Sequence, residues 1–131
     1  MIDHMGFRVR DLGAARAFYD ACAAALGLQT ADNGPESFVL GYSAAEPVPF
    51  IWIGITEPAF WTPAHVTSAS PIHLAFKAPD RATVERFYEA ALAAGGRDNG
   101  APGPRGPASM KYYAAFVLDP DGNNVEAGVR E

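Results

Sequence analysis

Apolar and polar residues alternate along two short stretches of the chain, positions 4–9 and positions 73–78. An alternation with a period of two predicts a β-strand that has one apolar face. The apolar set in each stretch is expected to pack beneath a helix. His4 and His73 belong to the other set, so both imidazoles are expected on the face that the helix leaves uncovered.

A helix is predicted after each of these strands. Apolar residues recur at steps of three and four along positions 12–26, and again along positions 84–91. Asp11 and Asp80 stand where an N-cap is expected, because their carboxylates can accept from unpaired backbone N–H groups. The expected left-handed stops are Gly27 and the Gly95-Gly96 pair.

Three further strands are expected in each half of the chain. In the first half they lie near positions 29–30, 37–42 and 50–55, and in the second near 97–98, 112–118 and 124–129. Residues 99–110 contain three Gly and three Pro and show no element pattern, so a lid over the site is expected there.

The two halves are copies of one unit. The same spacing of 69 residues separates several matching pairs: His4 and His73, Phe7 and Phe76, Asp11 and Asp80. We therefore predict two modules in one domain, about 1–65 and about 70–131, joined by a linker at 62–70. The element order β-α-β-β-β, given twice, predicts an α+β fold whose helices cover one face of the sheet and leave a concave site on the other.

Composition narrows the partners that can be expected. The 131 residues include 10 basic and 15 acidic ones, for a net charge of −5, and no cluster of Lys or Arg. Nucleic acid and anionic membranes are therefore not expected as partners. No apolar run is long enough to cross a bilayer, and the N-terminus lacks the pattern of a secretory signal. Cys22 is the single cysteine, so we expect no intrachain disulfide and a reducing, cytoplasmic setting.

The uncovered face gathers side chains that can bind a metal ion. Alternation places Glu126 there from the last strand, beside His4 and His73 from the first strand of each module. Two neutral imidazoles and one carboxylate can hold a divalent metal and leave coordination positions open. The alternative is that the histidines are ordinary core or interface residues and that Glu126 pairs with Arg8 or Lys77.

Cations and aromatic rings are expected around these residues. Arg8 and Lys77 share the face and can bind a carboxylate or phosphate, or else serve as surface cations near strand ends. Aromatic residues expected to form a wall for a flat or apolar small-molecule ligand are Phe50, Trp52, Trp61 and Tyr112.

The paired modules, the two copies of His-x-(Gly/Ala)-Phe and the closing segment 119–126 (DPDGNNVE) resemble the vicinal oxygen chelate superfamily. This superfamily includes glyoxalase I, extradiol dioxygenases, fosfomycin-resistance thiol transferases and bleomycin-resistance proteins. The resemblance covers essentially the whole chain. It implies metal ligands on the first and closing strands of each module, and His4, His73 and Glu126 match three of those four positions.

Two departures limit what the resemblance implies about the reaction. Trp52 falls on the fourth ligand position, where glyoxalase I-like enzymes carry an acidic residue. An indole neither ligates a divalent metal nor takes a proton, so ordinary glyoxalase I activity is not expected. Extradiol dioxygenases carry an acid-base tyrosine ten residues before the glutamate, where this chain has Phe116. Tyr112 has the same parity and is the alternative group for that role.

The resemblance thus implies a metal-dependent enzyme of lyase, dioxygenase or thiol-transferase type that acts on a small oxygenated substrate, with Glu126 as its catalytic residue. The expected cofactor is Fe, Mn, Ni, Zn or Co. The alternative is a metal-free binding protein of the bleomycin-resistance type. Short chains of this family commonly pair, so a homodimer is expected, and the site can come from one chain or from two.

Overall fold

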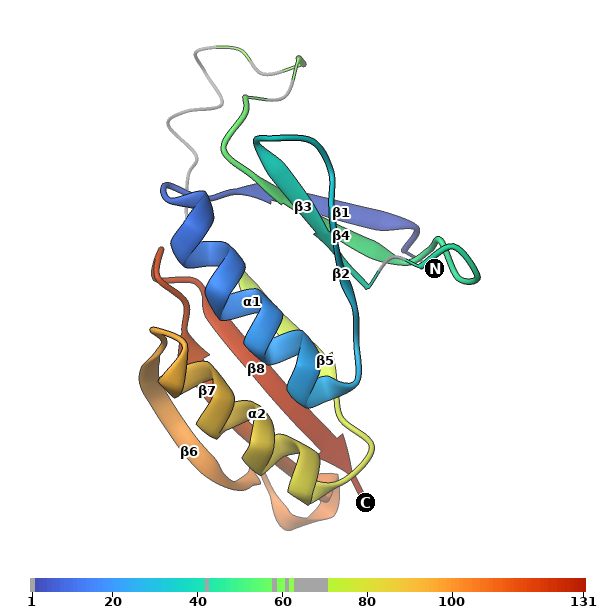
Figure 1. Cartoon of the computed structure of the whole chain (residues 1–131). Coiled ribbons are helices and arrows are strands. Elements are labelled where there is room, and N and C mark those ends of the chain that lie inside the picture. The colour runs from blue at the N-terminus through green and yellow to red at the C-terminus, as the bar shows by residue number, and fades with distance from the viewer. Residues whose placement is uncertain (1, 42, 58, 61, 63–70) are drawn as a thin grey trace.

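Two four-stranded sheets, each with one helix against it, make up the chain (Figure 1). The computed structural model describes residues 2–41, 43–57, 59–60, 62 and 71–131. The first module comprises β1 (His4–Arg8), α1 (Leu12–Leu26), β2 (Thr30–Asp32), β3 (Ser37–Leu40) and β4 (Phe50–Gly54). The second comprises β5 (His73–Lys77), α2 (Arg81–Ala93), β6 (Arg97–Arg105), the short 3-10 helix η2 (Ala108–Met110), β7 (Tyr112–Leu118) and β8 (Asn124–Arg130). The predicted α+β fold of two β-α-β-β-β modules is confirmed.

The strand order is the same in both modules. It is β1-β4-β3-β2 in the first sheet and β5-β8-β7-β6 in the second, and the pairs β1–β4 and β5–β8 are parallel. Within the described residues, β1 and β5 each have a single sheet neighbour, so each lies at a sheet edge. The chain therefore presents two separate open faces rather than one. Neither α1 nor α2 is long and apolar enough to span a membrane.

The predicted helix caps are present with one correction. The carboxylates of Asp11 and Asp80 accept from the backbone N–H groups of Ala14 and Thr83, at 2.9 and 2.7 Å. Gly27 takes the left-handed conformation at φ 72°, as expected. After α2, only Gly95 is left-handed (φ 97°). Gly96 is needed for a different reason, because a Cβ atom there would lie 2.5 Å from the side chain of Val117.

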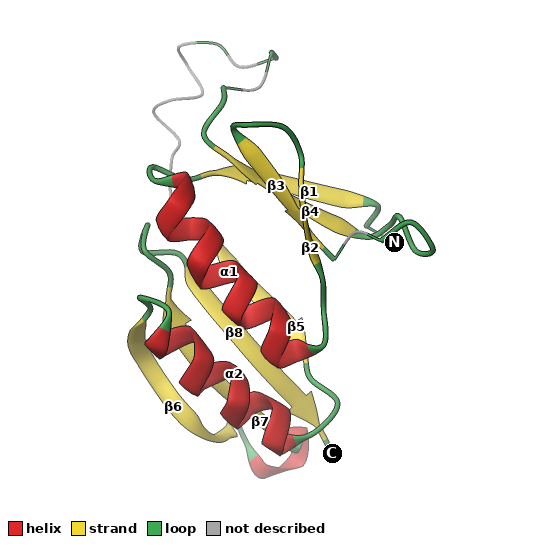
Figure 2. Cartoon of the chain, in the orientation of Figure 1, coloured by secondary structure: helices red, strands yellow, loops and turns green. Residues whose placement is uncertain are grey.

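The predicted alternation along the strands is confirmed. Ile53, Leu74, Val125 and Ala127 lie in one buried core that also contains residues of both helices. The side chains of His4 and His73 are 59% and 54% exposed on the opposite faces. Helices thus cover one face of each sheet (Figure 2), and the two histidines lie on the other.

The predicted lid is wrong, since residues 99–105 belong to the nine-residue strand β6 and residues 108–110 form η2. β6 pairs with β7 along its length, with register shifts on either side of Gly100. An edge strand tolerates Pro and Gly because one of its sides needs no hydrogen-bond ladder, and the shifts absorb the irregular residues. Most of the predicted linker, 63–70, and also Trp61 lie outside the described residues.

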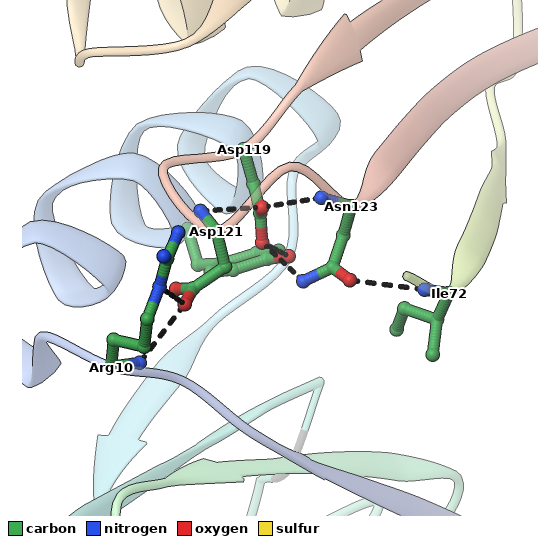
Figure 3. A network of polar contacts seen from close by, with 6 residues as sticks. Arg10, Ile72, Asp119, Asp121 and Asn123 are labelled. Atoms are coloured by element: carbon green, nitrogen blue, oxygen red, sulfur yellow. Dashed lines mark hydrogen bonds and ion pairs between the residues drawn. The ribbon is translucent and has the colours of Figure 1, made fainter. Parts of the chain in front are cut away.

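A buried polar network joins the turn before β8 to helix α1 (Figure 3). The Tyr19 hydroxyl donates to Asp119 Oδ2 at 2.7 Å, and both side chains are almost completely buried. Asp119 Oδ1 also accepts from the backbone N–H groups of Asp121 and Asn123, at 2.9 and 2.8 Å. Burial, with the charge of Asp119 beside it, raises the pKa of Tyr19 far above its ordinary value. Tyr19 therefore stays a donor, and every oxygen of Asp119 is used.

The same turn contacts two other segments. Asn123 Oδ1 accepts from the backbone N–H of Ile72 at 3.0 Å, which ties the turn to the residue before β5. Asp121 Oδ1 accepts from the backbone N–H and the Nε of Arg10, at 3.0 and 2.9 Å. The two modules are thus joined both by the packing of α1 beside α2 and by this network (Figure 1).

Replacing Tyr19 by Phe is expected to lower the free energy of unfolding by about 1–3 kcal/mol, because the buried Asp119 carboxylate loses a donor. The measurement is equilibrium unfolding in urea. The matched control is Tyr113→Phe, whose exposed hydroxyl donates to Glu85 and whose loss is expected to cost less than about 0.5 kcal/mol. Equal losses in the two variants would contradict the structural role given to the Tyr19–Asp119 bond.

Candidate functional site

His73 and Glu126 meet on the open face of the second sheet. They come from the adjacent parallel strands β5 and β8, whose register places Ala75 opposite Glu126. His73 Nε2 lies 3.1 Å from Glu126 Oε2. The glutamate side chain is only 6% exposed, whereas the imidazole is half exposed. A nearly buried carboxylate thus lies under a histidine that solvent and ligands can reach.

Tyr112 fixes the orientation of the glutamate. Its hydroxyl donates to Glu126 Oε1 at 2.5 Å, which leaves Oε2 on the side of His73. Burial, together with this hydrogen bond, raises the pKa of Tyr112 to about 12. Gly128 makes the contact possible, because a Cβ atom at that position would overlap the Tyr112 hydroxyl. The predicted alternative of an ion pair from Glu126 to Arg8 or Lys77 is not found among the described residues.

Two asparagines orient the imidazole. The Asn124 amide lies 2.8 Å from His73 Nδ1, and the Asn99 amide donates to Asn124 Oδ1 at 3.1 Å. An amide nitrogen only donates, so Nδ1 accepts, and the ring is held with its Nε2–H directed toward Glu126.

The pair fits two neighbouring ligands of one metal ion. Two ligand atoms about 2.1 Å from a metal and at right angles to each other are about 3.0 Å apart, close to the 3.1 Å between His73 Nε2 and Glu126 Oε2. A neutral imidazole and a carboxylate suit several divalent transition metals. The donor set of this half of the site therefore fits a divalent cation.

His4 lies on the other sheet, in an aromatic setting. Its ring stacks on Phe50 with 5.0 Å between centroids and an interplanar angle of 7°, and its Nδ1 lies 2.7 Å from Asp3. Trp52 lies over Gly54, where a Cβ atom would come within 2.5 Å of the indole. His4, Trp52 and Arg8 line a cavity of about 490 Å³ on this open face.

Arg8 and Lys77 differ in how they are held. The Arg8 guanidinium donates to the carbonyl of Ile55, at 2.9 Å from Nη2, and lies 3.4 Å from Glu57. Lys77 is exposed at the end of β5. Phe116 lies beside the imidazole of His73, with 6.5 Å between ring centroids.

The candidate site residues of one chain therefore fall into two separate groups, here called half-sites. The first-module half-site consists of His4, Phe50, Trp52 and Arg8, and the second-module half-site of His73, Glu126, Tyr112 and Phe116. Across residues 2–41, 43–57, 59–60, 62 and 71–131, no three His, Cys, Asp or Glu residues come close enough together to hold a metal ion. His4 does not join His73 and Glu126 in such a group within one chain. That all three bind one metal ion stays a prediction, and it now requires a second chain.

Almost the whole sequence matches one protein-family model. Residues 1–127 match the model of the Glyoxalase/Bleomycin resistance protein/Dioxygenase superfamily. The chain belongs to this superfamily. No curated protein matches the chain significantly.

Solved structures of the superfamily have the same architecture. A glyoxalase/bleomycin resistance protein from Albidiferax ferrireducens is 27% identical, with a TM-score of 0.75 over 100% of this chain and 99% of that one. A family enzyme from Burkholderia phytofirmans is 21% identical, with a TM-score of 0.69 over 98% of each chain. A glyoxalase-related enzyme from Fulvimarina pelagi is 16% identical, with a TM-score of 0.70 over 99% of this chain and 88% of that one. The last two likenesses concern the fold alone.

Sequence reasoning missed three residues that lie next to the second-module half-site. Asn99 and Arg105 fall in the segment taken for a lid, so their position on a strand was not recognised. Arg130 lies four residues after Glu126 and has the same parity, a signal that could have found it. Its guanidinium lies 4.4 Å from the centre of the Tyr112 ring.

The raised pKa of Tyr112 predicts how the site responds to alkaline pH. Between pH 10 and about 12 the unfolded phenol ionises while the folded one keeps its proton, so the folded state binds more protons and stability falls as pH rises. Tyr112→Phe is expected to lose less stability than the parent over this interval, as measured by urea unfolding at each pH.

Glu126→Gln serves as the companion variant. It keeps Tyr112 but removes the negative acceptor, so tyrosinate absorbance is expected to show the Tyr112 pKa moving down toward 10. An unchanged titration in this variant would show that Tyr112 does not donate to Glu126.

Proposed function

We propose that this protein is a metal-dependent enzyme that acts on a small oxygenated substrate through a centre formed by His4, His73 and Glu126. The observation that carries the proposal is the 3.1 Å approach of His73 Nε2 to Glu126 Oε2, which suits two ligands of one cation. Membership of a superfamily that contains glyoxalases and dioxygenases supports it. The reaction class is lyase, dioxygenase or thiol transfer, with Fe, Mn, Ni, Zn or Co as the cofactor.

Each side chain of the second-module half-site has a separate task in this proposal. Glu126 Oε2 and His73 Nε2 supply the donor atoms, while Tyr112 keeps Oε1 occupied and so sets the direction of Oε2. A divalent cation bound there would polarise paired oxygens of a substrate or activate dioxygen. Tyr112 is protonated at neutral pH, so its hydroxyl is a proton donor within reach of the carboxylate.

We propose that a second copy of the chain completes the centre. β1, which carries His4, and β5, which carries His73, each leave one edge without a partner strand in the described residues. Such edges favour association with another strand. An apolar cavity of about 410 Å³ lies between these strands and includes Met5, Leu74 and Phe76. A homodimer that places β1 of one protomer beside β5 of its partner would cover this surface and bring His4 to the His73–Glu126 pair.

A second candidate function is metal-free binding of a small aromatic molecule. The cavity beside His4 and Trp52 favours it, because stacked rings suit a flat ligand. The position of Trp52 also argues against ordinary glyoxalase I activity, since the indole stands where an acidic ligand would be required. The two candidates differ in whether metal binding depends on Glu126.

Glu126→Ala is expected to lower the affinity for a divalent metal by at least about tenfold, because it removes the anionic ligand. The measurement is calorimetric titration with Ni²⁺ and Zn²⁺, and tyrosine and tryptophan fluorescence reports on folding. The control is Glu57→Ala, which removes an exposed carboxylate near Arg8 and is expected to leave the affinity unchanged.

If Glu126→Ala binds metal as tightly as the parent, the proposed centre does not exist. The metal-free binding function would then describe the protein better.

A further inference from the structure

The second-module half-site borders a partly buried cation, Arg105, that forms no ion pair with an acidic side chain in the described part of the chain. Of the ten Lys and Arg residues, two are partly buried, Arg16 and Arg105, and the other eight are exposed. Arg16 lies 2.8 Å from Asp20 and 2.5 Å from Asp32. Arg105 has no carboxylate within ion-pair distance among the described residues. Arg16 thus shows how this fold compensates a cation that it buries, and Arg105 lacks that compensation.

The donors of Arg105 are poorly satisfied. Its Nη2 donates to the carbonyl of Ala101, while its Nε is buried with no hydrogen-bond partner among the described residues. Burying a charged group without a counter-charge or full hydrogen bonding is unfavourable. An anion bound at the remaining edge of the guanidinium would offset that cost.

The guanidinium is part of the same surface as the proposed metal ligands. It lies 5.2 Å from the centre of the Phe116 ring, and Phe116 in turn lies beside His73. A guanidinium that lies on an aromatic face can still bind an anion through N–H groups in its plane. One phenyl ring therefore separates a positioned anion-binding group from the imidazole.

Two exposed cations lie on the same face. Arg130 stacks on Tyr112, which pairs in register with both Arg130 and Arg105. Lys77 shares the parity of His73 along β5. Three cations thus border the site of a protein whose net charge is −5. This local charge favours an anionic ligand, although the chain as a whole is acidic.

We propose that Arg105, held on Phe116, binds a carboxylate of the substrate, so that the substrate class is small oxygenated carboxylic acids. The proposal rests on the proposed function only in assigning the carboxylate to a substrate of the His73–Glu126 centre. Arg105 is a specificity-determining residue here, with Arg130 and Lys77 adding positive potential.

The test compares benzoate with its neutral analogue benzamide, by calorimetry on protein that has been freed of metal ions by a chelator and then dialysed, so that the carboxylate cannot bind through a metal ion. The parent is expected to bind benzoate at least about tenfold more tightly than benzamide, since a charged hydrogen bond is lost in the amide. Arg105→Gln is expected to weaken benzoate binding about tenfold and to leave benzamide binding unchanged.

The control is Arg86→Gln, which removes the same charge from α2, where Arg86 donates to Thr83. It is expected to bind benzoate like the parent. Phe116→Leu keeps every charge but removes the ring beneath the guanidinium, so it is expected to weaken benzoate binding as well. This second variant tests the site independently if Arg105→Gln fails to fold.

Equal affinity for benzoate and benzamide in the parent, or unchanged benzoate binding in both variants, would overturn the proposal. Metal titration of Arg105→Gln distinguishes the anion-site proposal from the proposed function, because this variant is expected to retain the metal affinity of the parent. Loss of metal affinity in Arg105→Gln would show that Arg105 supports the fold rather than the ligand. Unchanged metal binding in Glu126→Ala would contradict the proposed metal centre but not the proposed anion site.

Discussion

The buried hydrogen bond from Tyr19 to Asp119 is the interaction on which the site depends. Asp119 holds the turn that leads into β8, the strand that carries Glu126. Through Asn123 the same turn accepts from the backbone of Ile72, and the Ile72 carbonyl accepts from Asn124. Ile72 precedes His73, so one network anchors both strands at the point where the imidazole and the carboxylate meet.

This arrangement also explains why the candidate metal ligands lie on two separate sheets. Helix α1 uses its buried face to join the two modules, and the core runs continuously beneath both sheets. The open faces are therefore held apart within one chain, each with its own candidate ligands and aromatic rings. His4 and the His73–Glu126 pair lie on different sheets, so the three side chains could bind one metal ion only if a strand of another chain lay beside β1 or β5. The proposed dimer follows from that geometry.

Much of the fold could be predicted because short-range rules govern it. Alternation along β1, β5 and β8 correctly placed His4, His73 and Glu126 on open faces, and the capping aspartates marked where α1 and α2 begin. The division into two sheets could not be predicted, since it depends on how the helices pack against each other. Only the start of β6 was predicted, near 97–98, because the Gly and Pro residues that follow are tolerated only at a sheet edge with register shifts. Arg105 lies in the part of β6 that was not predicted, and its place on the open face was therefore missed.

The most direct test of a site formed by two chains uses two variants that each lack one proposed ligand. His4→Ala and Glu126→Ala are each expected to lose tight metal binding as homodimers. A heterodimer of the two variants, isolated with two different affinity tags, would join His4 of one protomer to the intact His73 and Glu126 of its partner. The account predicts that this heterodimer regains one metal ion per pair of chains with the affinity of the parent. Failure of the heterodimer to bind metal, while the parent binds it, would contradict a centre built across two chains.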